Sequence, residues 1–119
     1  MNHTFSLFDT YQLEFTSNNI IKSDMLIEQI SILNLYPQSE KFSLIMENVN
    51  NINERHQSPL MVINDEVYTK DIINVFVPKS RIWKFYLTDT NGKRIKLNHE
   101  IVVNLIFKCH QQINIPIKY

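Results

Sequence analysis

The chain has 119 residues and no formal net charge, because 12 basic residues balance 12 acidic ones. With 44% hydrophobic and 20% charged residues it is too apolar for a disordered chain, and its length fits a single domain over residues 1–119. One glycine and no alanine exclude a glycine-rich phosphate loop and argue against a helical bundle.

The cysteine content and the distribution of apolar residues limit the cellular compartments in which the protein is expected. Cys109 is the only cysteine, so no disulfide can form within the chain, and a reducing environment is expected. The first ten residues do not show a positive charge followed by an apolar run, which argues against a cleaved signal peptide. No apolar stretch approaches the ~20 residues that cross a bilayer, so no membrane anchor is expected.

The zero net charge conceals an asymmetry along the chain. Residues 1–78 have a net charge of −6, and residues 79–119 have a net charge of +6. Within one domain we expect the two segments to interdigitate, so that their charges largely cancel. Charges segregated on the surface would instead favour head-to-tail contact between identical copies.

Alternation of apolar and polar side chains with a period of two predicts β-strands over most of the chain. Strands are expected at 9–16, 41–48, 73–77, 81–88, 94–97 and 101–108, with shorter ones at 60–63, 66–68 and 113–117. The apolar positions on one face of the longer strands are Tyr11, Leu13 and Phe15; Phe42, Leu44 and Met46; Ile73, Val75 and Val77; Trp83, Phe85 and Leu87; and Ile101, Val103, Leu105 and Phe107.

Residues 25–36 are compatible with two structures. Leu26, Ile30 and Leu33 would line one side of a helix, and Asp24 could mark its start. The β-branched residues and the alternation around Ile30 favour a strand, which is the interpretation adopted here.

The connections are predicted from turn-forming residues. Asn91-Gly92 is typical of a tight hairpin turn, and we interpret residues 81–108 as a three-stranded meander around it. The polar segment 48–58 is expected to be the longest loop. Eight or nine short strands without a fixed repeat predict an all-β fold, an antiparallel β-sandwich of jelly-roll type.

No catalytic, cofactor or metal site is predicted. His3, His56, His99 and His110 lack partners at the spacing of metal ligands, and neighbouring strand residues such as Cys109 and His110 point to opposite faces. An acid pair drawn from Glu54, Asp65 and Glu66 is interpreted as solvated turn residues. The chain contains no nucleophile elbow and no zinc-protease motif, so we do not expect an enzyme.

Basic residues in 79–96 alternate with aromatic ones, as in some single-strand nucleic-acid interfaces. The basic set consists of Lys79, Arg81, Lys84, Lys93, Arg94 and Lys96. However, Trp83 and Phe85 share the strand face opposite Lys84, so both are expected in the core. Nucleic acid is therefore not the partner that we expect.

Residues 76–108 contain a strand that ends in Asp89-Thr90-Asn91-Gly92, a short apolar strand, and then Glu100, Leu105 and Phe107. This arrangement resembles a C-terminal pattern of uncharacterised β-rich proteins of Polinton-like (Maverick) elements and related eukaryotic DNA viruses. His99 stands where that pattern has glycine. The resemblance implies a virion structural protein, penton-like or another minor capsid component, and implies no functional residues.

Besides single-strand nucleic-acid binding through residues 79–96, which is a third hypothesis, the sequence leads to two functional hypotheses. The first is a non-enzymatic viral or virus-derived minor capsid or virion subunit, without a cofactor, that contacts copies of itself or other virion proteins. Such a protein is expected in the virion, or in the cytoplasm or nucleus of the host cell. The alternative is a glycan-, peptide- or receptor-binding β-sandwich module that uses loops such as 48–58.

Overall fold

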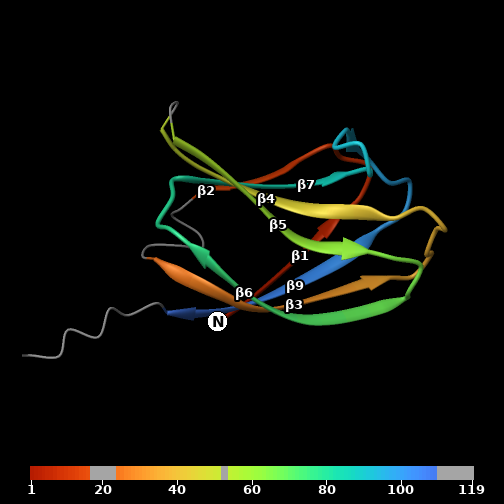
Figure 1. Ribbon diagram of the computed structural model, residues 1–119, viewed down its shortest axis with the longest axis horizontal. Helices are drawn as coiled ribbons and strands as arrows, with labels where there is room; N and C mark the ends of the chain where they lie inside the picture. The colour runs from red at the N-terminus through yellow and green to blue at the C-terminus, as the bar shows by residue number, and fades with distance from the viewer. Residues whose placement is uncertain (17–23, 52–53, 110–119) are drawn as a thin grey trace, which may run out of the picture.

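The computed structural model describes residues 1–16, 24–51 and 54–109, and these form nine β-strands and no helix (Figure 1). The strands are β1 (Asn2–Leu7), β2 (Leu13–Thr16), β3 (Met25–Asn34), β4 (Phe42–Asn51), β5 (Glu54–Ile63), β6 (Tyr68–Val77), β7 (Ile82–Thr88), β8 (Arg94–Ile95) and β9 (Ile101–Cys109). No helix capable of crossing a membrane occurs in these three ranges. The predicted strand at 113–117 lies outside the described residues.

The strands form two antiparallel sheets that pack face to face (Figure 1). Sheet A has the order β1-β9-β3-β6, and sheet B has the order β2-β7-β4-β5, with the short β8 also beside β7. Most connections pass from one sheet to the other, which is the arrangement of a jelly roll. The predicted all-β sandwich is therefore confirmed.

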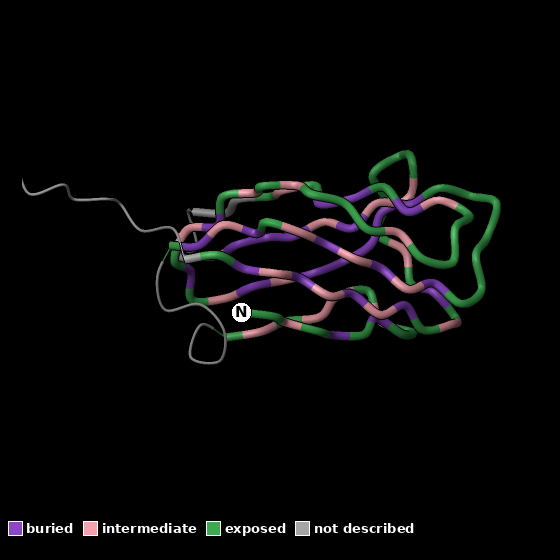
Figure 2. Tube along the Cα trace, turned by 90° about the horizontal axis from the view of Figure 1, so that it is seen from below, coloured by how far each residue is buried: buried purple, intermediate pink, exposed green. Residues whose placement is uncertain are grey.

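The core lies between the sheets, and buried positions alternate with more exposed ones most regularly along β1, β3 and β9 (Figure 2). Three predicted inward faces are confirmed, because every member is buried: Phe42, Leu44 and Met46; Trp83, Phe85 and Leu87; and Ile101, Val103, Leu105 and Phe107. Val77 is also buried, whereas Leu13 and Phe15 of the short β2 are only partly covered. Tyr11 is 53% exposed and lies before β2, so the predicted strand at 9–16 begins later than expected.

The segment that was compatible with a helix or a strand is the strand β3. Its pairing with β9 shifts between Ile27 and Gln29, so Glu28 is an extra residue in the ladder. This bulge moves the inward face from Met25 and Ile27 to Ile30, Ile32 and Asn34. Of the three residues with helical spacing, only Ile30 is buried, and Leu26 and Leu33 are half-buried on the other face of the strand.

The prediction that residues 48–58 form the longest loop is wrong. Strand β4 continues to Asn51 and β5 starts at Glu54, and the two strands pair along their whole length. The polar composition of this segment had indicated a loop, but backbone pairing across a hairpin does not require apolar side chains.

The interpretation of residues 81–108 as a meander is also wrong. Strand β8 pairs with β7 in sheet B, but β9 lies between β1 and β3 in sheet A, so the chain changes sheets after β8. The predicted hairpin turn itself is confirmed. Gly92 has a φ of +81°, and the Asp89 carboxylate accepts the N–H groups of Asn91 and Lys93, both at 2.9 Å.

Two further strands differ from the prediction. Residues 66–68 and 73–77 do not belong to separate strands, because the single strand β6 runs from Tyr68 to Val77. Strand β1 was not predicted at all; it pairs with β9, almost a hundred residues later in the chain. The strands of the two charge segments interdigitate as expected, since β9 lies between β1 and β3, and β7 lies between β2 and β4.

Candidate functional site

The titratable groups that the sequence singled out are not brought together. His3 lies on β1 near the rings of Phe5 and Phe15, and the Nε2 atom of His99 is 3.0 Å from Oδ1 of Asn34. Asp65 and Glu66 lie in the turn between β5 and β6. No group of three or more His, Cys, Asp or Glu side chains in the described ranges could hold a metal ion. The side chains of Glu54, His56 and Cys109, and all of His110, lie outside the description.

His3 occupies the gap between two edge strands, β1 of sheet A and β2 of sheet B. Its ring centroid is 5.4 Å from that of Phe5 and 4.8 Å from that of Phe15. Burial among these rings lowers the pKa of His3, because the charged imidazolium loses its hydration there. The environment thus favours the neutral imidazole, which acts as an aromatic packing group.

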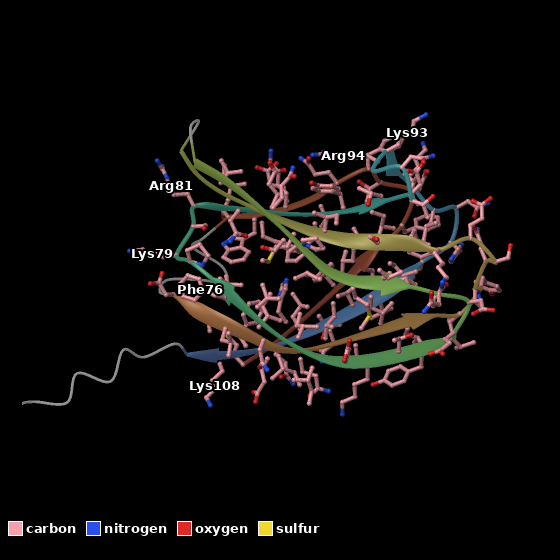
Figure 3. The ribbon with its side chains drawn as sticks, viewed as in Figure 1. Phe76, Lys79, Arg81, Lys93, Arg94 and Lys108 are labelled. Carbon is pink, nitrogen blue, oxygen red and sulfur yellow. The ribbon has the colours of Figure 1, made fainter. Side chains whose placement is uncertain are left out.

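The basic residues of 79–96 do not form one patch. Lys79 and Arg81 lie at one end of the sandwich, whereas Lys93 and Arg94 lie toward the opposite end, beyond the length of β7 (Figure 3). Trp83 and Phe85 are each 1% exposed, so neither ring can stack on a base. The charges and the aromatic rings of this segment therefore do not combine into a nucleic-acid surface.

The outer face of sheet B is covered in part by Arg94. Its guanidinium lies 4.0 Å from the Tyr86 ring centroid, its Nη1 donates to Oε1 of Gln12 at 2.8 Å, and its Nη2 is 3.6 Å from Oε2 of Glu47. The Glu47 side chain is only 4% exposed. An adjacent hollow of about 420 Å³ is lined by Ile45, Gln57, Pro59, Tyr86, Thr88, Gly92 and Arg94. Arg94 thus links β8 to Tyr86, Gln12 and Glu47, and these contacts give it a structural role on this face.

The outer face of sheet A carries half-buried apolar side chains beside polar pairs such as Thr4–Asn104. The half-buried apolar side chains include Leu26, Leu33, Val102 and Ile106. On β6, the outward side chains of Tyr68, Ile72 and Phe76 are exposed by 56%, 69% and 49%, and they follow one another at intervals of four residues. A row of large exposed apolar side chains along one strand is typical of an interaction surface.

Strand β6 is also an edge strand. In sheet A it pairs with β3, and no strand in the described part of the chain pairs with its other side. The backbone N–H of Ile72 donates to the Asp71 carboxylate at 2.9 Å, in an exposed position. Because the Asn34 N–H donates to the Val67 carbonyl, alternate residues from Val67 to Asp71 face β3, so the Ile72 N–H faces the free edge of the sheet.

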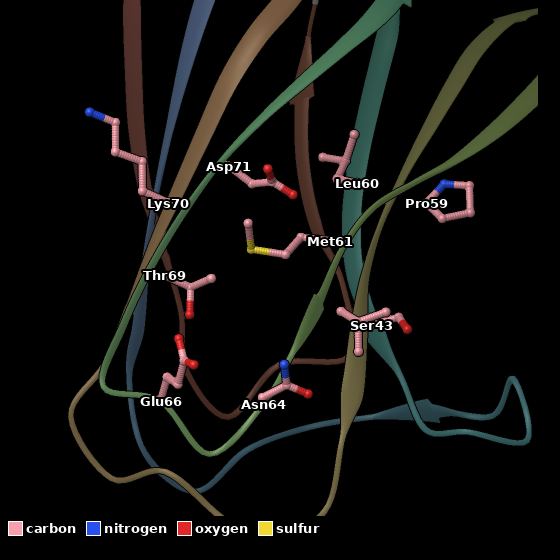
Figure 4. Close-up of a pocket in the computed structure, with 10 residues that line it drawn as sticks. Ser43, Pro59, Leu60, Met61, Asn64, Glu66, Thr69, Lys70 and Asp71 are labelled. Atoms are coloured by element: carbon pink, nitrogen blue, oxygen red, sulfur yellow. The ribbon is translucent and has the colours of Figure 1, made fainter.

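The inner flank of β6 borders a hollow, because the two sheets separate between β5 and β6. This hollow has a volume of about 610 Å³ (Figure 4). Its lining combines Leu60, Met61 and Val62 with polar side chains that include Asn64, Glu66, Thr69 and Asp71. The first half of β6 is therefore accessible on its outer face, along its edge and from the inside.

Sequence reasoning missed this strand as a candidate site. The charged pair Lys70-Asp71 interrupts the apolar alternation, so residues 66–77 were divided between two short strands. The four-residue spacing of Tyr68, Ile72 and Phe76 is visible in the sequence. This spacing indicates an accessible surface only if β6 lies at the edge of a sheet. The sequence does not show this, because strand order is a property of the whole fold.

The fold and these surfaces define a jelly-roll β-sandwich in which the edge strand β6 is accessible. No protein-family profile matches the chain, and no curated protein matches it. Among solved structures, the NLP core of Drosophila, described in connection with pentamer formation and histone binding, has a TM-score of 0.55 at 13% sequence identity. The match covers 92% of this chain and 99% of that chain, and it shows that the two proteins share a fold.

A second solved structure, that of infectious bursal disease virus strain Gx, has a TM-score of 0.39 at 7% sequence identity. This match covers 89% of this chain and 33% of that chain. A similarity of this degree supports no conclusion, and none is drawn from it.

Proposed function

We propose that this protein is a non-enzymatic structural subunit that acts through protein–protein contacts, and in the first place with copies of itself. The observation that carries this proposal is the row of exposed apolar side chains on β6, at one edge of sheet A. Apolar surface that is left in water by a single chain is covered when chains associate, and this provides the driving force for assembly.

The comparison with the NLP core supports the same proposal. That protein shares the fold over nearly its whole length, and its structure is described in terms of pentamer formation. A sandwich of this kind is thus able to serve as the repeating unit of a closed assembly. The charge arrangement of the present chain, with both signs interdigitated in both sheets, leaves apolar contact as the main source of affinity.

The finer proposal is a viral or virus-derived minor capsid or virion subunit. It is supported by the resemblance of residues 76–108 to β-rich proteins of Polinton-like elements and related DNA viruses. Under this proposal the partners are copies of the chain and other virion proteins. The protein would then be found in virions, or in the cytoplasm or nucleus of the host cell.

Light scattering coupled to size-exclusion chromatography tests the proposal. Over a concentration series, we expect an assembly with a mass that is a multiple of the 14.2 kDa chain. Native mass spectrometry would then give the number of copies. A mass of one chain at every concentration, alone and with other proteins of the same virion, would contradict the proposal.

A second candidate function is the binding of a small polar ligand, such as a glycan, in the hollow between β5 and β6. The polar groups around this hollow favour it over the segment 48–58, which forms a strand hairpin rather than a loop. A glycan array with the purified protein provides the test. Specific binding that is lost in Thr69→Val and Asn64→Leu variants would support this function, and an array without specific signals would exclude it for the glycans tested.

A further inference from the structure

The three sheet edges that remain in the described part of the chain, apart from the short β2 and β8, are not equivalent. Strand β5 contains Pro59, which cannot donate a hydrogen bond, and its ladder with β4 is irregular next to this residue. Strand β1 has only six residues. Strand β6 has ten residues and no proline, and the Ile72 N–H is directed to its free edge. An added strand would therefore find most of its hydrogen bonds at β6.

The side chains of β6 are arranged symmetrically about Ile72. Tyr68 precedes Ile72 by four residues, and Phe76 follows it by four. In an antiparallel pairing of two identical strands centred on this residue, Ile72 of one copy faces Ile72 of the other. Tyr68 of one copy and Phe76 of the other then lie toward the same end of the contact, so exposed apolar side chains occur on both sides of the two-fold axis.

The direction of the backbone groups is compatible with a pairing centred on Ile72. In an antiparallel strand the N–H and C=O groups of one residue point to the same side, so both groups of Ile72 face the free edge. Two Ile72 residues placed opposite one another could then exchange two N–H···O=C bonds. Asn74 has a φ of +48°, which bends the strand, so the regular ladder is confined to the residues around Ile72.

We infer that a second copy of this chain docks against β6, as an antiparallel strand about a two-fold axis at Ile72, so that sheet A continues from one copy into the other. This inference rests on the proposed function and specifies its contact. The two-fold contact is distinct from a ring contact, which joins two different surfaces of each copy. One assembly can contain both.

The Asp71 carboxylate opposes this docking in the single chain. It accepts the Ile72 N–H, and the paired state has to release this bond before the two backbones can join. The charge also has to be accommodated at the contact, where Asp71 faces Ile73 of the second copy. Asp71 thus acts as a protecting residue of the edge, comparable to the charged side chains that limit uncontrolled pairing of exposed strands.

Site-directed cross-linking tests the register. In a background that carries Cys109→Ser, the variant Ile72→Cys is expected to form an intermolecular disulfide under mild oxidation, because paired antiparallel residues have Cα atoms about 5 Å apart. Lys70→Cys and Val62→Cys are matched controls on β6 and on the other long edge strand, and neither is expected to link to itself.

Association measurements test the contact independently. Sedimentation equilibrium of Ile72→Lys is expected to show an association constant at least tenfold below that of the natural chain, whereas Val62→Lys, at a similarly exposed position, leaves it unchanged. Asp71→Asn is expected to strengthen association several-fold. Circular dichroism of each variant establishes that the sandwich is folded.

The outcomes separate this inference from the proposed function. Assembly that persists unchanged in Ile72→Lys, with no disulfide in Ile72→Cys, would overturn the β6 contact and leave self-association standing. A single chain at every concentration would overturn both. Cross-linking at Ile72 together with weakened assembly in Ile72→Lys would establish the two-fold contact.

Discussion

Arg94 of β8 lies over the ring of Tyr86 of β7, with 4.0 Å between its guanidinium carbon and the ring centroid. The same guanidinium is 3.6 Å from the carboxylate of Glu47. We expect Arg94→Ala to lower the free energy of unfolding by about 2 kcal/mol, because it leaves a buried carboxylate without its cation and removes the stacking contact. Urea unfolding monitored by circular dichroism measures this change.

Two controls distinguish the loss of the Arg94 contacts from a general destabilisation of the β7–β8 hairpin. Lys93→Ala, at the neighbouring exposed position, should change stability by less than about 0.5 kcal/mol. In a double-mutant cycle, Glu47→Gln should reduce the cost of Arg94→Ala, since no unpaired charge then remains. Equal costs of Arg94→Ala in both backgrounds would show that the ion pair contributes nothing.

Asn48 and Trp83 face each other across β4 and β7 inside the core, and each is 1% exposed. Oδ1 of Asn48 and Nε1 of Trp83 are both buried without a hydrogen-bond partner in the described residues. We expect Asn48→Leu to be neutral or to stabilise the protein by about 1 kcal/mol, because it replaces an unpaired acceptor with an apolar group of similar size.

The reverse change on the same strand face provides the comparison for Asn48. Leu44→Asn introduces a polar group at a position that is 0% exposed, and it should cost about 3 kcal/mol. Thermal and urea unfolding of both variants provide the measurement. A loss of more than about 1 kcal/mol in Asn48→Leu would show that the Asn48 amide has a stabilising role in the core.

The lowered pKa of His3 makes the stability of the folded protein depend on pH. Burial lowers its pKa in the folded protein below the value of about 6.5 in the unfolded chain. The unfolded chain then binds more protons, so the contribution of His3 to stability is complete at higher pH and is lost as the pH falls below about 6.5. The loss levels off below the folded-state pKa.

Replacement of the imidazole isolates this contribution. We expect His3→Phe to preserve the contacts with Phe5 and Phe15 and to retain more of its stability than the natural chain between pH 7.5 and pH 5.5. Thr4→Ala, the next residue on the opposite strand face, should leave the pH dependence unchanged. Identical slopes for the natural chain and His3→Phe in urea unfolding would contradict the assignment.

The elements that sequence alone predicted well are those whose side-chain pattern is determined locally. Trp83, Phe85 and Leu87 alternate with more polar neighbours because one face of β7 meets the core, and no knowledge of the partner strand is needed. The turn at Gly92 was equally predictable, since its positive φ restricts the residue type.

The remaining features depend on contacts between distant segments. Strand β1 has only two buried apolar residues, Phe5 and Leu7, and its position is determined by pairing with β9. The change of sheet between β8 and β9 leaves no local mark in the sequence. The accessibility of Ile72 follows from the edge position of β6, so the candidate contact could be recognised only when the strand order was known.

Gly92 allows a prediction about backbone conformation alone. Its φ of +81° is unfavourable for residues with a Cβ atom, but nothing lies within 4 Å of the place that a Cβ would occupy. Gly92→Ala should therefore lower the free energy of unfolding by about 1 kcal/mol through backbone strain without steric overlap, and Gly92→Asn should cost less, because asparagine tolerates this region. Asn91→Ala, whose backbone N–H retains its bond to Asp89, is the matched control and should stay within about 0.5 kcal/mol of the natural chain. Equal effects of Gly92→Ala and Asn91→Ala on the urea midpoint would show that the turn is not held in this conformation in solution.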